Sequence, residues 1–368
     1  MTTIGIIGAG KLGQMLGYAG SDVDQDLEFV FLDPSDQPPA ASAGTVLKYA
    51  FDDPAGLREL AERADVVTYE FENVPVDAIE SITSTVPVYP PADALRFAQD
   101  RLFEKNLFQE LDIPLPGFRT VDQVSDLEEA AAALGLPIVL KTRRLGYDGK
   151  GQVLIRDASQ FADAVNSLGV ENLIAEAFVP FDREVSAIGV RNVSGDTACY
   201  PLTENEHDNG ILSRSRAPAD GGSLQALAND YLDRLLSRLD YVGVLALELF
   251  VVGDELLANE FAPRVHNSGH WTIEGAETSQ FANHLRAILD MAPGDTGVRG
   301  HAGMLNLIGD MPEDLAAIEA QSACLHDYGK SPRPGRKLGH VTLLADGPDA
   351  RDERLSALAK SLKIGSKT

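Results

Sequence analysis

Short apolar runs alternate with amphipathic segments along the first 95 residues, and this alternation predicts an α/β domain with a buried sheet. The runs TIGIIG, LEFVFLD and DVVTYEFE have the length and composition of buried strands, and residues 11–19 have helical spacing. The second run ends at Asp33, and the third ends near Glu70 and Glu72. We therefore predict a Rossmann-like domain over residues 1–95.

A proline-rich stretch, PVYPPADAL at residues 87–95, predicts a boundary after this domain. We expect Asp93 to cap a helix that continues to Glu110. Beyond it, short strands and helices alternate, and an Ala-rich helix over residues 127–134 is expected to stop at Gly135. From about residue 300 the chain is β-rich up to Leu344, and a last helix is expected from Glu353 to about Leu362.

Two neighbouring apolar segments each carry one glutamate. YVGVLALELFVV contains Glu248, and ELLANEF, which follows across a Gly-Asp turn, contains Glu260. Adjacent antiparallel strands can hold both carboxylates on one face, where bare charges would repel and one would take up a proton. A hard divalent cation with oxygen ligands removes this conflict. The alternative is a pair of solvent-facing glutamates on a strand surface.

A dense polar cluster follows this pair at once and favours the interpretation as a site. The segment NEFAPRVHNSGHW supplies Arg264, His266, Asn267, Ser268 and His270 within seven residues. A surface strand has no need for so many different hydrogen-bonding groups, whereas a site for an anionic reactant does.

The first turn, GAGKLG, is a candidate phosphate-binding element. Gly8, Gly10 and Gly13 follow a strand and open a helix, and Asp33 lies twenty residues past Gly13. This is the fingerprint of a dinucleotide site, which makes a dehydrogenase a serious alternative. A helix N-terminus also holds any other phosphate, and glycines here can serve strand–helix packing alone. The pattern therefore predicts a Rossmann-like domain without selecting a ligand.

A second glycine-rich element, RRLGYDGKGQVLI, follows the strand PIVLKT. Gly146, Gly149 and Gly151 punctuate a hairpin whose backbone amides can close over phosphates, with Asp148 at its tip. Lys141 and Lys150 supply positive charge. The spacing is not that of a Walker loop, so the element indicates a nucleotide site of another kind.

The segment LIAEAFV, followed by a loop and Glu184, is the candidate for the rest of such a site. We expect LIAEAFV to form an edge whose backbone groups meet an adenine rim, and Glu184 to accept from ribose hydroxyls. Exposed glutamates at strand starts are common, so Glu184 on its own carries little weight.

The turn GKSPRPGRK contains the densest positive charge in the chain, at Lys330, Arg333, Arg336 and Lys337. Such a cluster is usually a solvated loop. In a chain with a formal charge of −25, a 5′-phosphate would need focused positive charge of this kind. Arginines offer bidentate contacts to a phosphate that lysines cannot.

Composition limits the classes of function. The charge of −25 argues against nucleic acid and membrane surfaces as partners. Cys199 and Cys324 are too few for a disulfide framework or a zinc site, which indicates a reducing compartment. The N-terminus has no basic leader pattern and no long apolar run occurs, so we expect a cytoplasmic protein.

Several motifs together resemble a known family. GYDGKGQ, YPLTENEHDNGIL, NEFAPRVHNSGHWTIEGA and YGKSPRPGRKLGHVT are similar to the ATP-grasp superfamily and, within it, to the N5-carboxyaminoimidazole ribonucleotide synthetases. The resemblance covers nearly the whole chain. It implies an α/β fold with a Rossmann-like pre-ATP-grasp domain over 1–95, an ATP-grasp domain over 96–295 with a lid subdomain at about 115–180, and a β-rich C-terminal domain over 296–368.

The resemblance also implies a nucleotide site. Phosphates would meet Lys105 and Lys141 beneath the glycine hairpin, adenine would meet Glu176, and the ribose would meet Glu184. The full implied set is Lys105, Lys141, Gly146, Gly149, Lys150, Gly151, Gln152, Glu176, Ala177, Phe178, Val179, Glu184, His207 and Asn259.

The implied acceptor site and metal site lie next to it. Glu248 and Glu260 would ligate Mg2+, with Mn2+ as an alternative. Many relatives carry a metal-ligating Asn two residues after the second Glu, where this chain has Ala262, and we expect Asn267 to take over part of that role. The catalytic set is Asp148, His207, Arg264 and Asn267, and the substrate set is Tyr147, Asp148, His266, Asn267, Ser268, Lys330, Arg333 and Arg336.

The reaction implied is the ATP- and bicarbonate-dependent carboxylation of 5-aminoimidazole ribonucleotide through carboxyphosphate, in purine biosynthesis. The resemblance further implies a homodimer and transfer of the product to a mutase of the same pathway. The main alternative is another ATP-grasp carboxylate–amine ligase, such as formate-dependent glycinamide ribonucleotide transformylase. An NAD-linked oxidoreductase ranks third because it leaves the Glu248–Glu260 pair unexplained.

Overall fold

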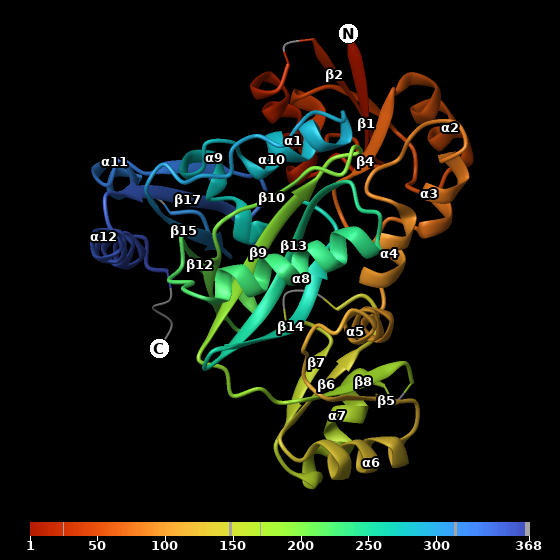
Figure 1. Cartoon of the computed structure of the whole chain (residues 1–368), viewed down its shortest axis with the longest axis vertical. Helices are drawn as coiled ribbons and strands as arrows, with labels where there is room; N and C mark the ends of the chain where they lie inside the picture. The colour runs from red at the N-terminus through yellow and green to blue at the C-terminus, as the bar shows by residue number, and fades with distance from the viewer. Residues whose placement is uncertain (25, 147–148, 170, 313–314, 365–368) are drawn as a thin grey trace.

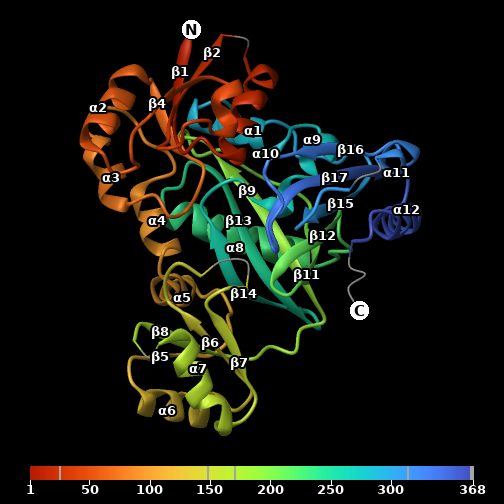
Figure 2. The same ribbon diagram turned by 180° about the vertical axis from the view of Figure 1, so that it is seen from behind.

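The computed structural model describes residues 1–24, 26–146, 149–169, 171–312 and 315–364, and these ranges form three sheets (Figures 1 and 2). The N-terminal sheet and a small four-stranded sheet lie at opposite ends of the molecule in Figure 1, and the largest sheet lies between them. Tyr147 and Asp148, which the sequence singled out, lie outside the described ranges.

The N-terminal sheet is parallel and has the order β3-β2-β1-β4. Its strands are buried on both faces, since separate apolar clusters pack on each side, as their continuous apolar runs predicted. The elements are β1 (Thr2–Ile7), α1 (Lys11–Ala19), η1 (Gly20–Asp22), β2 (Leu27–Leu32), η2 (Pro39–Ser42), β3 (Thr45–Leu47), α2 (Pro54–Arg63), β4 (Val66–Tyr69) and α3 (Val76–Ile82).

The single helix expected from Asp93 to Glu110 is instead two helices, α4 (Ala92–Ala98) and α5 (Arg101–Glu110). The prediction was wrong because Asp100 begins the second helix: its carboxylate accepts from the Leu102 amide at 3.0 Å. The same carboxylate accepts from the Arg143 guanidinium at 3.0 and 2.8 Å. Asp100, at the break, therefore links α5 to the segment that follows β6 (Ile138–Thr142).

The small sheet is antiparallel, with the order β5-β8-β6-β7, and two helices cover it. The Ala-rich helix ends at Leu134 as predicted, and Gly135 follows with φ of 77°. The remaining elements are β5 (Phe118–Val121), α6 (Val124–Leu134), β7 (Gln152–Ile155), η3 (Ala158–Gln160), α7 (Phe161–Leu168) and β8 (Leu173–Ala177).

The largest sheet is antiparallel and has nine strands in the described ranges, in the order β14-β13-β9-β11-β12-β15-β17-β16, with β10 beside β9. The C-terminal strands extend it without a break, because β12 pairs with β15. Its elements are β9 (Arg183–Arg191), β10 (Thr197–Cys199), β11 (Thr203–Asp208), β12 (Ile211–Ala217), α8 (Leu224–Arg238), β13 (Gly243–Val252), β14 (Glu255–Ala262), η4 (Asn267–Gly269), α9 (Thr272–Gly275), α10 (Gln280–Ile288), β15 (His301–Ile308), α11 (Ala316–Ala320), β16 (Cys324–Asp327), β17 (Lys337–Ala345) and α12 (Pro348–Ser361).

The last helix, α12, begins five residues before the predicted Glu353 and ends one residue before Leu362. Pro348 at its first position fits this earlier start, because proline is tolerated where the backbone amide has no helical partner. Among the helices in the described ranges, none has both the length and the apolar character that a membrane crossing requires.

Candidate active site

A cleft of about 720 Å3 lies where the three sheets meet. Among its described lining residues are seven lysines and arginines and seven glutamates. The chain as a whole has 31 basic and 56 acidic residues, so positive charge is concentrated in this cleft. The cleft is therefore charge-balanced, with as many lysines and arginines as glutamates in its described lining.

Glu248 and Glu260 face each other across two strands of this cleft. The predicted pairing is confirmed: β13 and β14 are antiparallel, and Glu248 and Glu260 are directly opposite in register. Burial, followed by the charge of Glu260, raises the pKa of Glu248 to about 7. This excess of negative charge, carried by oxygen atoms, is what a bound divalent cation would relieve, so the pair fits such an ion.

A lysine–glutamate–lysine cluster lies beside the glutamate pair. Glu176 of β8 is 3.0 Å from the Nζ of Lys141 and 3.4 Å from the Nζ of Lys105. Burial alone would raise the pKa of Glu176, but the two lysines outweigh it and hold that pKa at about 2. Lys105 is buried and donates to the Asn259 carbonyl oxygen at 2.7 Å, so it lies behind the cleft wall. Glu176 therefore fixes both ammonium groups.

The expectation that LIAEAFV forms a sheet edge was wrong. Strand β8, which contains Glu176, is internal and pairs with β5 on one side and β6 on the other. The Phe178 amide donates to the Pro137 carbonyl oxygen at 3.3 Å. Ala177, Phe178 and Val179 still line the cleft at the end of this strand. The sequence did not show the internal position because strand pairing is a tertiary property.

The glycine hairpin joins β6 to β7, as predicted. Gly149 and Gly151 have φ of 73° and 71°, a region that glycine adopts without strain. A Cβ on Gly149 would lie 2.7 Å from the Asn209 carbonyl oxygen, so the hairpin packs closely against the β11–β12 turn. Gly146, Gly149, Lys150 and Gln152 line the cleft, whereas Gly151 does not.

His207 and Glu184 form a hydrogen-bonded pair on adjacent strands. Glu184 lies at the start of β9, as expected, and its carboxylate accepts from His207 Nδ1 at 2.7 Å. Burial lowers the pKa of His207, but the hydrogen bond to Glu184 and the charge of Glu248 together raise it above its ordinary value. The pair offers the cleft a carboxylate and an imidazole whose positions are linked.

The segment after β14 brings Arg264 and His266 into the cleft. The Arg264 guanidinium donates to the Glu72 carboxylate of the N-terminal domain. His266 accepts at Nδ1 from the Ser268 amide at 3.3 Å, and its Nε2 lies 3.2 Å from a Glu248 oxygen. Burial lowers the pKa of His266 well below its usual value, so the ring is neutral.

Two other members of the same segment are hydrogen-bonded within the protein, and one of them, Ser268, lies outside the described lining of the cleft. Ser268 is fully buried behind His266, at 2.8 Å from its Nδ1, and does not line the described cleft. Asn267 lines the cleft, but its carbonyl oxygen accepts from Asn306 at 2.6 Å and its amide donates back at 3.1 Å. Its carbonyl oxygen is thus engaged by Asn306 of β15 in this arrangement.

The glycine turn before α1 already binds a side-chain carboxylate, that of Glu70. The Glu70 carboxylate accepts from the Gly10 amide at 2.5 Å and from the Gly13 amide at 2.6 Å. A Cβ on Gly8 would lie 2.5 Å from Glu70. Asp33, the acid of the dinucleotide fingerprint, accepts from the Ala9 amide at 3.0 Å. The dinucleotide interpretation fails because Glu70 fills the place of a pyrophosphate.

Of the basic turn, Lys330 and Lys337 line the cleft. Arg333 is exposed, and neither it nor Arg336 is part of the described lining. Arg336 donates instead to the backbone and side-chain oxygens of Ser331, both at 3.3 Å. The turn therefore directs lysines, rather than arginines, towards the cleft.

The sequence analysis missed several cleft residues, above all those on α5. Arg101 lies 3.5 Å from Glu260, and Glu104 accepts from the Phe261 amide at 2.7 Å. Burial, partly offset by Lys105, raises the pKa of Glu104 to about 8. The signal was present, because Glu104 and Lys105 share the buried face of α5 with apolar residues. Glu70, Glu72 and Lys11 carried no comparable signal.

Comparison with known proteins places this geometry in a family. The ATP-grasp domain family matches residues 106–281, the ribonucleotide synthetase preATP-grasp domain matches 1–99, and the phosphoribosylaminoimidazole carboxylase C-terminal domain matches 302–354. An N5-carboxyaminoimidazole ribonucleotide synthase from Pseudomonas aeruginosa is 52% identical over 340 residues, which cover 92% of this chain and 94% of that protein.

Solved structures agree with this assignment. The crystal structure of N5-carboxyaminoimidazole ribonucleotide synthetase from Thermus thermophilus has a TM-score of 0.92 and 51% identity, and covers 99% of both chains. An N5-carboxyaminoimidazole synthase from Aspergillus clavatus, in complex with ADP and 5-aminoimidazole ribonucleotide, has a TM-score of 0.89 and 28% identity, and covers 98% of both chains. The chain belongs to the N5-carboxyaminoimidazole ribonucleotide synthase family of ATP-grasp enzymes.

Proposed function

We propose that this chain uses ATP and bicarbonate to carboxylate the amino group of 5-aminoimidazole ribonucleotide. The products are N5-carboxyaminoimidazole ribonucleotide, ADP and phosphate, and the reaction belongs to purine biosynthesis. The observation that carries the proposal is one cleft in which the Glu248–Glu260 pair lies between a lysine-rich nucleotide half and a half formed by Arg264, His266 and Lys330. The Aspergillus clavatus relative, which was solved with ADP and 5-aminoimidazole ribonucleotide, supports the same pair of ligands.

In the nucleotide half, Lys141 and the hairpin containing Lys150 are proposed to bind the ATP phosphates. Glu176 keeps Lys141 and Lys105 charged and in place, because a carboxylate between two ammonium groups offsets the cost of burying them. The end of β8 is proposed to hold the adenine. Glu184, which His207 positions, is proposed to hold the ribose.

We assign Glu248 and Glu260 to a divalent cation, Mg2+ in the first place. Among the described residues, no group of three or more His, Cys, Asp or Glu is close enough together to hold a metal ion by itself, so these two carboxylates would share the ion with phosphate oxygens. When bound, the ion would neutralise charge on the transferring phosphoryl group.

In the acceptor half, Arg264 and His266 are proposed to hold bicarbonate and the carboxyphosphate formed from it. The exocyclic amine forms a bond to the carboxyl carbon as the bond from that carbon to the phosphate oxygen breaks, and phosphate leaves. The amine's proton passes to Asp148 or to the departing phosphate. His266, which is neutral, can donate from Nε2 but does not compete for that proton.

The remaining parts of the proposal concern the cell. We propose that the enzyme is a cytoplasmic homodimer whose carbamate product passes to a mutase of the same pathway. Light scattering of the purified protein tests the dimer, and a mass corresponding to one 39.4 kDa chain would contradict it.

The test of the activity is phosphate release from MgATP and bicarbonate, with and without 5-aminoimidazole ribonucleotide. We expect the ribonucleotide to stimulate release, and glycinamide ribonucleotide to have no such effect. Equal stimulation by both acceptors, or by neither, would overturn the assignment.

A further inference from the structure

Two lysines from distant parts of the chain meet on one aromatic ring in the cleft. The Nζ of Lys11, the first residue of α1, lies 5.3 Å from the centre of the Tyr328 ring. The Nζ of Lys330, from the basic turn, lies 5.4 Å from the same centre. Both distances are within the range of a cation–π contact, and all three residues line the cleft. The ring therefore collects two positive charges at one wall.

The hydrogen bonds of Lys11 go to neutral acceptors, and its charged neighbours are Asp327 and Lys330. Its ammonium donates to the Gln14 side-chain oxygen at 2.7 Å and to the Asp327 carbonyl oxygen at 2.9 Å, both of which are neutral acceptors. Burial lowers the pKa of Lys11, the charge of Asp327 raises it, and the charge of Lys330 lowers it further. The two lysines thus repel each other, and a dianion between them would relieve that repulsion.

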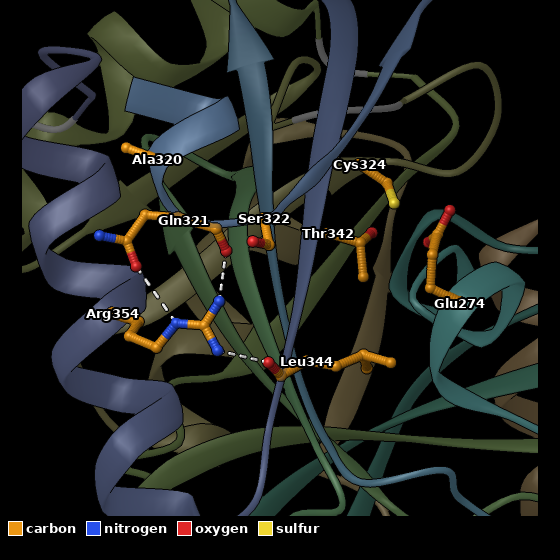
Figure 3. Close-up of a pocket in the computed structure, with 8 residues that line it drawn as sticks. All are labelled: Glu274, Ala320, Gln321, Ser322, Cys324, Thr342, Leu344 and Arg354. Carbon is orange, nitrogen blue, oxygen red and sulfur yellow. Dashed lines mark hydrogen bonds between the residues drawn. The ribbon is translucent and has the colours of Figure 1, made fainter. Parts of the chain in front are cut away.

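Tyr328 is held in place by a series of side chains, of which His340 is buried and His326 and Glu274 are partly exposed. Its hydroxyl lies 2.8 Å from His340 Nδ1, and the His340 ring stacks on the His326 ring at 4.4 Å. His326 Nε2 donates to the Glu274 carboxylate at 2.6 Å. Glu274 lines a second cavity of about 470 Å3, separate from the cleft, beside Cys324 and Thr342 (Figure 3). These contacts fix the orientation of the Tyr328 ring, which both lysines contact.

The glycine turn next to Lys11 cannot take a phosphate, because Glu70 already occupies its amides. The nearest positive groups for an anion at this end of the cleft are therefore side chains. Arg333 and Arg336 lie outside the described lining, whereas Lys11 and Lys330 are part of it.

We propose that Lys11 is a substrate-binding residue that, together with Lys330 on the Tyr328 ring, holds the 5′-phosphate of the ribonucleotide. The proposal rests on the proposed function for the identity of the ligand. It makes α1 of the N-terminal domain part of the acceptor site through a lysine side chain, and it identifies the phosphate as the group that this lysine recognises.

The experiment compares Lys11→Gln and Lys330→Gln with Lys360→Gln, which removes one charge from an exposed position of α12. KM is measured for 5-aminoimidazole ribonucleotide, for the riboside that lacks the phosphate, and for ATP. Both cleft variants should raise KM for the ribonucleotide about ten- to a hundredfold, the effect of losing a charge-assisted contact. KM for the riboside and for ATP should stay unchanged, and Lys360→Gln should behave like the wild type.

Calorimetric binding of ribose 5-phosphate gives a readout that does not depend on turnover. If the wild type does not carboxylate the ribonucleotide, but binds ribose 5-phosphate and loses that binding in Lys11→Gln, the proposed function fails and the phosphate site stands. If the wild type is active and Lys11→Gln leaves KM for the ribonucleotide unchanged, or raises KM for the riboside equally, the inference is wrong. Should Lys11→Gln fail to fold, Lys11→Met, which keeps the length of the side chain but removes its charge, decides by the same two measurements.

Discussion

At the scale of single residues, the Glu248–Glu260 pair gives the sharpest separation of function from stability. Glu260→Gln keeps the shape of the side chain but removes one charge from the proposed ion site. We expect turnover to fall more than a hundredfold at saturating ATP, while the melting temperature stays the same or rises, because like-charge repulsion is relieved. Steady-state kinetics and thermal unfolding measure the two effects.

Glu255→Gln is the matched control for that prediction. Glu255 lies on the same strand, β14, but is exposed and outside the described lining of the cleft. Its substitution should leave turnover unchanged. Near-normal turnover in Glu260→Gln would mean that Glu248 and Glu260 are solvent-facing glutamates that do not bind the ion.

For the buried Glu176 we predict the opposite effect: its substitution should lower the free energy of unfolding. Glu176→Gln leaves the ammonium groups of Lys105 and Lys141 without their carboxylate, and removing one partner of a buried ion pair costs about 3–5 kcal/mol. Glu59→Gln breaks a partly exposed pair with Arg63 and should cost at most about 1 kcal/mol. Urea unfolding at neutral pH compares the two variants, and equal losses would contradict the assigned burial.

The pKa of Glu176 also fixes a pH dependence. It is held at about 2, below its ordinary value of 4.5, so the folded state binds its proton less readily than the unfolded state. The stability that Glu176 contributes is therefore complete above pH 4.5 and is lost as the pH falls towards 2. The difference in stability between wild type and Glu176→Gln should shrink over this interval in acid titrations of unfolding.

At the scale of elements, the glycine hairpin can be tested against a glycine with the same backbone requirement. Gly149 and Gly169 have φ of 73° and 81°, but only a Cβ on Gly149 meets a neighbour, the Asn209 carbonyl oxygen at 2.7 Å. Alanine at either position should cost about 1–2 kcal/mol of stability from backbone strain. Only Gly149→Ala should raise KM for ATP, since it alone displaces the hairpin. Equal KM values would mean that the hairpin does not contact the nucleotide.

The elements themselves were largely predictable, but their partners were not. Strand β13 and the end of α6 at Gly135 follow from apolar run length and from glycine, which are local properties. The internal position of β8 depends on its pairing with β5 and β6, and Asp100 at the break before α5 bonds to Arg143. These partners come together only on folding. In the same way, the glutamate pair was readable from adjacent strands, whereas Glu70 was not, because its partners lie 57 to 60 residues away.

At the scale of the whole molecule, the cleft is assembled from lobes, and the N-terminal lobe shares one continuous apolar core with the largest sheet. Arg264 bonds to Glu72 across one boundary, and His284 Nε2 lies 2.9 Å from Thr68 Oγ1 across the same boundary. The small sheet at the other end contributes Lys141 and the hairpin to the nucleotide half. ATP would thus contact the small sheet and the largest sheet, and the ribonucleotide would contact the N-terminal domain and the largest sheet. Binding of each ligand should stabilise the contact between its two lobes.

This arrangement predicts different protection patterns for the two ligands in hydrogen exchange. MgATP at a hundredfold its Kd stabilises the states that bind it by about 2.7 kcal/mol, which slows the opening of the lobes it bridges by about a hundredfold. We expect MgATP to slow exchange in β6, β7 and β8, where Lys141 and Glu176 lie, and to leave β1 and β2 unchanged. The ribonucleotide alone should slow exchange at the start of α1 and in the turn that carries Lys330, and leave β6 to β8 unchanged. Uniform slowing by either ligand would mean that the molecule opens as one unit and that the lobes are not separately coupled to their ligands.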